Sequence, residues 1–400
     1  MKLVKFSLAA ALAAGMFATS ASAVALEEAI KDVDISGLAF VRYQMNKDNS
    51  KESSSTWKFR TVTNLQTKID DNFFFLAGIR YGVDAPDTDE GSFGTSTTSN
   101  GQDTDKKFML NQLLVGWTPG STTVMAGRYT LGTFFTDDMY GDGIKVVNTG
   151  IEGTVLAALW ADALEADGDI GTLGLDLLGT DDAIKDLTGK KVTDHNLFGV
   201  AAIGSYNPIS YQMWYAYLQD VAALFAIETA LNFEISDNVG LGLKGQYAFT
   251  KFDGEFKTAV PVVDDSKFAG GELSFNAFGF DASAGYVYYK AKNGSYSLSS
   301  FEDNGAFISA GEILASYSFY QGRNDYWFAT AGYTIPGTGL RIGADYLSGK
   351  FNEEKADEVV GRLEYDYNSK LNFTGWYAYA NYKDADYKED IMRLQATYKF

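Results

Sequence analysis

Long runs of residues that alternate between apolar and polar or small side chains are the feature that most constrains the fold of this chain. Runs of about ten residues recur along most of the sequence, and turn-forming residues separate them. A period of two predicts β-strands with one apolar face and one polar face. Clear examples lie at 239–250, 340–347 and 371–380. Periodicity alone leaves two folds open, because a soluble β-sandwich and a membrane barrel give the same alternation.

The connections between these runs separate the two folds. Very short turns are expected at 70–72, 119–120, 148–150, 236–238 and 368–370. Mostly longer polar and acidic loops come between them, such as 84–105, 162–193, 251–266 and 383–389. Short turns that alternate with long loops are typical of a transmembrane barrel, whose two rims face different compartments. A sandwich has no reason to alternate its connections in this way.

Counting the strands provides a further test. We expect strands near 34–44, 57–69, 73–82, 107–118, 122–129, 144–148, 151–161, 194–204, 209–218, 222–234, 239–250, 267–275, 279–290, 325–334, 340–348, 358–368, 371–382 and 390–400. This gives eighteen, the even number that bacterial single-chain barrels require. Residues 308–320 also resemble a strand, but a nineteenth strand would break the alternation of connections. We therefore interpret 291–324 as one long loop that folds back into the barrel.

The N-terminus predicts export. Lys2 and Lys5 precede an uncharged stretch at 8–19, and Ala21-Ser22-Ala23 matches the cleavage pattern of a secretory signal peptide. We expect a signal peptide at 1–23 and one barrel domain at 24–400. No later apolar run is long enough for a membrane helix, so an exported chain of this kind would enter a membrane as a barrel.

The C-terminus also indicates an outer-membrane barrel. Alternating positions of the last segment carry Met392, Leu394, Ala396, Tyr398 and the terminal Phe400. A terminal Phe behind alternating apolar residues resembles the signal by which outer-membrane barrels are recognised for assembly. The predicted fold class is therefore all-β: a transmembrane antiparallel barrel of about eighteen strands, in the Gram-negative outer membrane.

Composition excludes most kinds of chemistry. The chain has no cysteine and a single histidine, His195, so a thiol nucleophile, a thiolate zinc site and a multi-histidine centre are impossible. No G-x-S-x-G motif accompanies the histidine. The formal net charge of −19 disfavours nucleic acid as a partner. We therefore expect no enzyme.

Basic residues fall on the predicted polar faces of several strands. These are Arg42, Lys58, Arg60, Arg80, Arg128 and Arg393. We expect them on the inner wall, because a lipid-facing cation costs about 2–4 kcal/mol at mid-membrane. Acidic residues Asp137 and Asp138 lie in the segment 130–143, which we expect to fold inward like 291–324. Cations facing carboxylates across the lumen would form a pore constriction.

A barrel of about 16–18 strands encloses a water-filled channel. The sequence therefore predicts passive passage of ions and small hydrophilic solutes, and its acidic balance predicts a modest preference for cations. Two alternatives stay open: a surface adhesin or structural barrel protein, and a solute-selective channel with a regular ladder of binding residues.

Several blocks of the sequence resemble the Campylobacter-type major outer-membrane porins. They are Leu26–Gly37, Gly143–Asn148, Ala201–Tyr206, Arg341–Asp345 and Arg393–Phe400. The resemblance runs the whole length and implies an eighteen-stranded general porin that forms a homotrimer among outer-membrane lipid and lipopolysaccharide.

The resemblance also implies a structural calcium ion among inward-folded loops, held by two aspartates and a glutamate. The matching positions are Asp142, Asp176 and Glu312. Hard oxygen ligands of this type suit Ca²⁺.

Overall fold

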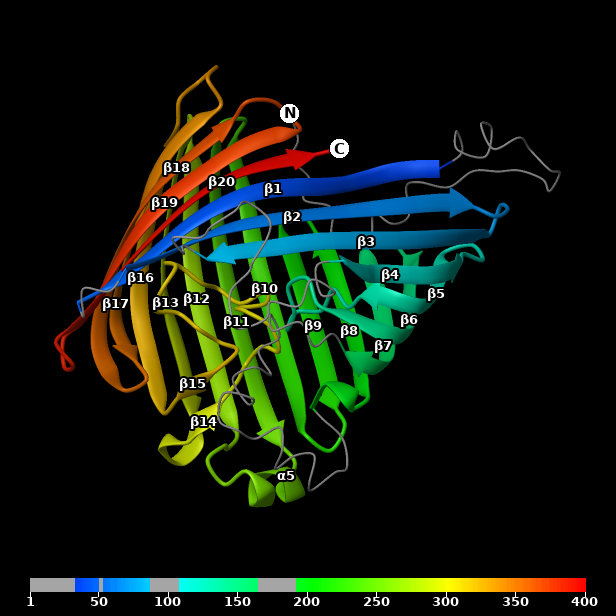
Figure 1. Ribbon diagram of the computed structural model, residues 1–400, viewed down its shortest axis with the longest axis horizontal. Coiled ribbons are helices and arrows are strands. Elements are labelled where there is room, and N and C mark those ends of the chain that lie inside the picture. Colours follow the sequence, from blue (N-terminus) through cyan, green and yellow to red (C-terminus); the bar gives the residue numbers. More distant parts are fainter. Residues whose placement is uncertain (1–32, 50–52, 87–107, 165–191) are drawn as a thin grey trace.

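The computed structural model describes residues 33–49, 53–86, 108–164 and 192–400, and within them eighteen strands form one antiparallel sheet. The sheet closes because β1 (Val33–Asp48) pairs with β20 (Tyr387–Lys399). Figure 1 shows β20 in red beside β1 in blue. The predicted barrel and its strand number are therefore confirmed, whereas the predicted signal peptide lies outside the described residues.

The other barrel strands follow in chain order around the wall. They are β2 (Ser53–Lys68), β3 (Phe73–Pro86), β4 (Phe108–Trp117), β5 (Thr122–Thr130), β6 (Tyr140–Ile151), β7 (Thr154–Leu164), β8 (Leu197–Tyr206), β9 (Ile209–Leu218), β10 (Ala222–Ser236), β11 (Val239–Phe252), β12 (Ser266–Ala277), β13 (Phe280–Ala291), β16 (Arg323–Thr334), β17 (Leu340–Phe351), β18 (Glu354–Asp366) and β19 (Leu371–Tyr382).

Within the described residues, the connections contain three short elements, apart from two 3-10 turns at Val192–Asp194 and Lys292–Gly294. The helix α5 (Gly254–Ala259) follows β11, and β14 (Tyr296–Ser297) pairs only with β15 (Tyr320–Gln321). Among the described residues, no helix is long and apolar enough to cross a membrane.

The structure corrects two details of the predicted connections. The turn expected at 148–150 lies inside β6, and the chain reverses at Glu152–Gly153, where Gly153 has a φ of 73°. On the rim with the long loops, β17 and β18 are joined by Asn352 and Glu353 alone, both with positive φ. Alternation of loop length is thus a property of most, but not all, of the connections.

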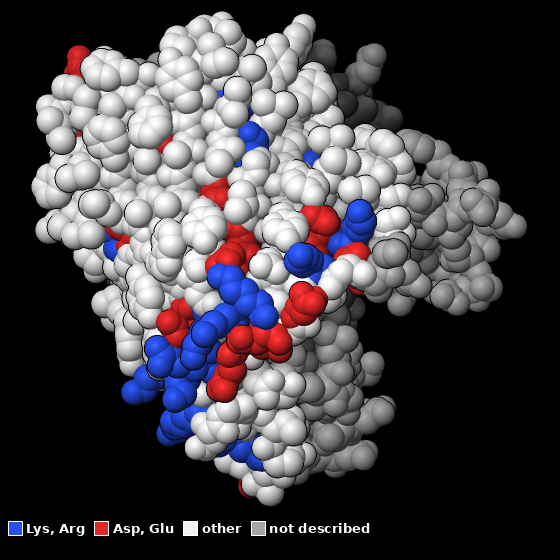
Figure 2. Space-filling view, turned by 90° about the vertical axis from the view of Figure 1, so that its left-hand side faces the viewer, with Lys and Arg blue, Asp and Glu red and all other residues white. Residues whose placement is uncertain are grey.

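The two faces of the wall differ as the alternation predicts. Val41, Leu243, Trp327 and Val359 are 40%, 51%, 49% and 49% exposed, and their strand neighbours Phe328 and Val360 are buried. Figure 2 shows that much of one side of the molecule is free of charge, while Lys, Arg, Asp and Glu gather in a band. A belt without charge is what the hydrocarbon layer requires of a barrel.

The barrel closes with the terminal residue of the chain. The Phe400 N–H donates to the Gly37 carbonyl (3.1 Å), and the Gly37 N–H donates to the Phe400 carbonyl (3.0 Å). A Cβ at Gly37 would lie 2.0 Å from the Val62 carbonyl oxygen and 2.9 Å from the Phe400 ring. Glycine is therefore required where β1, β2 and the C-terminus meet.

The segment between β13 and β16 folds into the lumen, as predicted, and residues 308–320 are not a barrel strand. Its buried Phe307 and Tyr317 pack on Phe268 of β12 at ring distances of 4.5 and 5.2 Å. Phe134, from the connection between β5 and β6, meets Phe307 at 4.7 Å. The hydrophobic core is therefore a cluster of two inward loops against one side of the barrel wall, and not a filled cylinder.

Candidate functional site

Five of the predicted cations lie on the inner faces of neighbouring strands, opposite the exposed apolar residues of the same strands. Pairing between β1 and β2 places Arg42 opposite Lys58, and Arg60 opposite Phe40. On either side, Arg80 of β3 lies opposite Val62, and Arg393 of β20 lies opposite Gln44. We call Arg42, Lys58, Arg60, Arg80 and Arg393 the basic wall.

Neutral and aromatic partners orient several of these guanidinium groups. Arg42 Nε donates to Gln395 Oε1 (2.6 Å), and Arg393 donates twice to Gln44 Oε1 (3.0 and 2.8 Å). The guanidinium of Arg42 also lies over the ring of Phe40 at 4.8 Å, and that of Arg393 over Trp376 at 4.9 Å. Cation–π contacts and amide acceptors fix the position of a guanidinium group.

An acidic loop meets this wall. Residues 131–139, between β5 and β6, fold inward as predicted, and Asp138 Oδ2 lies 3.2 Å from Arg60 Nη1. The neighbouring Asp137 is exposed. The predicted opposition of cations and carboxylates is therefore present as a direct contact between this loop and strand β2.

The buried carboxyl group of Glu302 joins the two inward loops. Its Oε2 accepts the backbone N–H of Asp137 (2.7 Å) and of Met139 (2.9 Å). Backbone bonds from Phe301 to the Phe135 carbonyl and from Ala306 to the Phe134 carbonyl continue the contact. Burial raises the pKa of Glu302 to about 9, and a hydrogen bond with Asp138 contributes in the same direction.

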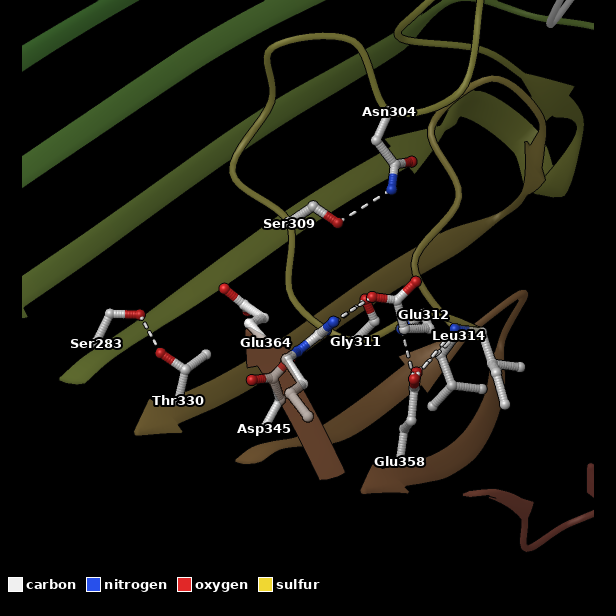
Figure 3. A network of polar contacts seen from close by, with 12 residues as sticks. Ser283, Asn304, Ser309, Gly311, Glu312, Leu314, Thr330, Asp345, Glu358 and Glu364 are labelled. Atoms are coloured by element: carbon white, nitrogen blue, oxygen red, sulfur yellow. Dashed lines mark hydrogen bonds and ion pairs between the residues drawn. The ribbon is translucent and has the colours of Figure 1, made fainter. Parts of the chain in front are cut away.

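A second carboxylate fixes the loop to the barrel wall. Figure 3 shows Glu358 of β18 pointing at the loop. Its two oxygens accept three successive backbone N–H groups, those of Glu312 (2.5 Å), Ile313 (3.1 Å) and Leu314 (2.9 Å). Successive N–H groups that converge on one anion form a nest, and Gly311, with a φ of 81°, provides the backbone reversal before it. The fully buried Glu358 thus binds main chain and does not face the pore.

Arg362, on the same face of β18, adds an ionic network. Its guanidinium donates to Asp345 Oδ2 of β17 (2.8 and 2.5 Å) and pairs with the Glu312 carboxylate. The same strand therefore binds both the backbone of 312–314 and the side chain of Glu312.

Two predicted site residues lie elsewhere. Arg128 of β5 is opposite Leu113, which is on the outer face of β4, and Asp142 of β6 is on the face of the exposed Ile144. Arg128 and Asp142 bind each other through two hydrogen bonds of 2.7 and 2.8 Å. Placing Arg128 in the lumen was therefore wrong, because a paired outward arginine avoids the cost assumed for a lone one.

The predicted calcium ligands do not meet in the described structure. Asp142 faces outward with Arg128, whereas Glu312 lies in an inward loop with Arg362. Asp176 lies outside the described residues. Within the described residues, no three His, Asp or Glu side chains form a group that could hold a metal ion.

Sequence reasoning missed Glu302, Glu358 and Arg362. Strand alternation does place Glu358 and Arg362 on the inner face of β18, beside the exposed Val359 and Leu363. Nothing in the local sequence indicates that their partners are the backbone and side chain of a loop about 50 residues earlier. Glu302 likewise follows a serine-rich stretch with no periodicity to mark its direction.

Comparisons with known proteins agree with the architecture. The family model for the Campylobacter major outer membrane protein matches residues 1–400. No curated protein matches the chain in sequence.

Solved structures share the fold at low sequence identity. Pseudomonas aeruginosa OpdL is 13% identical with a TM-score of 0.69, covering 92% of this chain and 99% of its own. Acinetobacter baumannii OccAB3 is 11% identical with a TM-score of 0.68, covering 92% and 100%. Pseudomonas aeruginosa OccK8 (OprE) is 16% identical with a TM-score of 0.68, covering 92% and 98%.

Replacing Glu358 by Ala should release the inward loop. Three backbone N–H groups would lose their acceptor, so the amides of 312–314 should exchange with solvent at least ten-fold faster by hydrogen exchange mass spectrometry. Asp357→Ala, on the opposite face of the same strand, is the matched control and should leave these amides protected. Equal protection in E358A and wild type would contradict the anchoring role.

Contact between the two inward loops should weaken as pH rises. Glu302 has a raised pKa in the folded state, so its stabilising contribution is complete below about 4.5 and is lost as pH rises through about 9. Glu302→Gln is isosteric with the protonated acid and should keep the loops together at high pH. Limited proteolysis of loop 131–139 between pH 6 and 10 measures this, with Asp303→Asn as the charge control. A pH profile of E302Q identical to that of wild type would exclude Glu302 as the titrating group.

Proposed function

The chain belongs to the Campylobacter major outer membrane protein family, and from this premise we propose a general porin whose basic wall and acidic loops set its ion preference. It is an outer-membrane channel for passive diffusion, and its apolar outer wall contacts membrane lipid. A closed barrel with polar groups on its inner face needs no chemical step to let hydrophilic solutes pass. We therefore assign no enzymatic activity to it.

The contact between Arg60 and Asp138 carries the proposal. It brings a carboxylate of the inward loop to the basic wall, so opposite charges face each other at the same level of the lumen. Charged rings at a narrow point of a channel discriminate ions and orient dipolar solutes. The five residues of the basic wall lie on β20 and β1–β3, whereas the inner-face cations Lys244, Arg341 and Arg362 of β11, β17 and β18 are each in an ion pair with a carboxylate. This distribution favours a general porin over a solute-selective channel.

A modest cation preference is part of the proposal. The formal charge of −19 supports it, since an acidic vestibule concentrates cations. The basic wall attracts anions, and its effect is confined to short range. The adhesin alternative depends mainly on the long acidic loops, and much of these, 87–107 and 165–191, lies outside the described residues.

Planar bilayers containing the purified protein test the constriction. Stepwise conductance is expected, and its absence would remove the porin proposal. In a KCl gradient, Asp138→Asn should lower the permeability ratio of K⁺ to Cl⁻ by roughly two-fold, and Arg60→Gln should raise it by a similar factor. Both effects should shrink at high salt. Asp357→Asn, on the outer face, should leave the ratio unchanged. Equal ratios for D138N, R60Q and wild type would show that these residues do not line the narrow point.

A homotrimer is proposed from the family resemblance, and the outward Arg128–Asp142 pair supports it. Two charged groups among exposed apolar residues are better accommodated between subunits than in lipid, because a protein interface can supply further polar partners.

Calcium binding by Asp142, Asp176 and Glu312 stays a prediction, and the described positions of Asp142 and Glu312 do not support one shared ion. A chelator decides the question: a bound ion predicts a chelator-sensitive change in trimer stability that Asp176→Ala or Glu312→Ala abolishes. Identical thermal stability with and without chelator would discard calcium.

A further inference from the structure

A row of cations lines the outer face of the barrel at the ends of six consecutive strands. The row consists of Lys251, Lys267, Lys290, Arg323, Lys350 and Lys355, one residue from each of β11, β12, β13, β16, β17 and β18. All six are exposed. The closing contact of Gly37 and Phe400 lies at one rim of the barrel, and these six residues lie at the other rim. In a barrel with periplasmic termini, this other rim is extracellular. We call these six residues the basic rim.

The outward direction of the basic rim follows from its strand neighbours. Phe268, Tyr289 and Asn324, each next in sequence to a rim cation, are at most 1% exposed and lie on the inner face. Since successive side chains of a strand point to opposite faces, Lys267, Lys290 and Arg323 point away from the lumen.

Strand pairing sets like charges directly opposite each other. Lys267 is opposite Lys290, Lys290 is opposite Arg323, and Lys350 is opposite Lys355. Directly opposed like charges destabilise a sheet. Three such pairs in one stretch of wall are therefore an arrangement that an external anion would stabilise.

The protein itself supplies few counterions to the basic rim. Asp325 binds Arg323 at 2.8 Å and lies opposite Lys350 in the strand pairing, and nearby Asp357 pairs with Lys383. Among the residues that the structure describes, the ammonium groups of Lys267, Lys290 and Lys350 form no ion pair. The excess charge of the row is thus positive and faces outward.

Aromatic residues fix the depth of the basic rim in the membrane. Phe249, Trp327 and Tyr346 are outward-facing and exposed, and each lies on a strand that ends in a rim cation. Trp327 and Tyr346 also contact each other, with ring centroids 5.1 Å apart. Aromatic girdles mark the interface between hydrocarbon and headgroups, so cations one or two residue pairs further out, about 7–13 Å, reach the headgroup layer. Figure 2 shows the charged band of this side below a surface largely free of charge.

We propose that the basic rim is a binding site for the phosphate groups of a phosphorylated glycolipid in the outer leaflet, of the lipopolysaccharide type. The inference rests on the outer-membrane placement of the proposed function, but not on ion passage. Lysines spaced along adjacent strand ends can each approach a lipid phosphate from the side, where acyl chains of the same molecule would cover the aromatic belt.

The full-length protein, refolded in neutral detergent, tests the site with labelled lipid A that carries two phosphates, in the presence of EDTA. Lys267→Gln/Lys290→Gln should weaken binding by about five-fold for each lysine removed. Lys370→Gln/Lys399→Gln removes two exposed lysines at the opposite rim and should bind like wild type. Single-channel conductance of both variants should equal that of wild type, so a failure of this proposal is distinguishable from a failure of the porin proposal.

Two lipid probes separate the proposed ligand from other sources of attraction. Lipid A stripped of its phosphates should bind as weakly to wild type as phosphorylated lipid A binds to K267Q/K290Q. Phosphatidylglycerol should compete poorly, because it offers one phosphate on a smaller headgroup. Equal binding of the stripped lipid, equal competition by phosphatidylglycerol, or unchanged affinity of K267Q/K290Q would overturn the proposal.

Discussion

The pairing of the first strand with the last is the interaction on which the rest of the structure depends. In a hydrocarbon layer no water satisfies an open sheet edge, so a sheet is stable there only when each strand has two neighbours. Here β1 bonds both β2 and β20, and the backbone of Phe400 extends the seam to Gly37. The basic wall exists because of this closure, since Arg393 reaches Gln44 only across the seam.

Within the closed wall, buried carboxyl groups determine where the inward loops lie. Glu358 binds three N–H groups of one loop, and Glu302 binds two N–H groups of the other. A loop that runs through a barrel cannot use the sheet for its hydrogen bonds, and its buried amides need other acceptors. A carboxyl group can accept hydrogen bonds from several amides at once, and the aromatic contacts of Phe134, Phe268 and Phe307 then exclude water around them. The lumen is narrowed by main chain held in this way.

Charged residues of the barrel wall are therefore distributed differently on its inner face, on its outer belt and at its rim. Inward cations of β20 and β1–β3 meet the acidic loop at Asp138, the outer belt is apolar and aromatic, and a basic rim ends β11 to β18. Each zone has its own environment: water in the lumen, hydrocarbon around the belt and headgroups at the rim. The same period-two alternation serves all three, because a strand presents one face to each side of the wall.

The sequence by itself determined the class of fold, the eighteen strands, the inward course of 291–324 and the inner position of Arg42, Lys58, Arg60, Arg80 and Arg393, because alternation and turn residues are local properties of the chain. It placed Arg128 on the wrong face, since its partner Asp142 on the neighbouring strand β6 is not visible locally. Only the tertiary structure decided that Glu302 and Glu358 hold the loops and that Lys267, Lys290 and Arg323 stand side by side. These contacts depend on which strands become neighbours and on where distant loops return, and closure of the ring sets both.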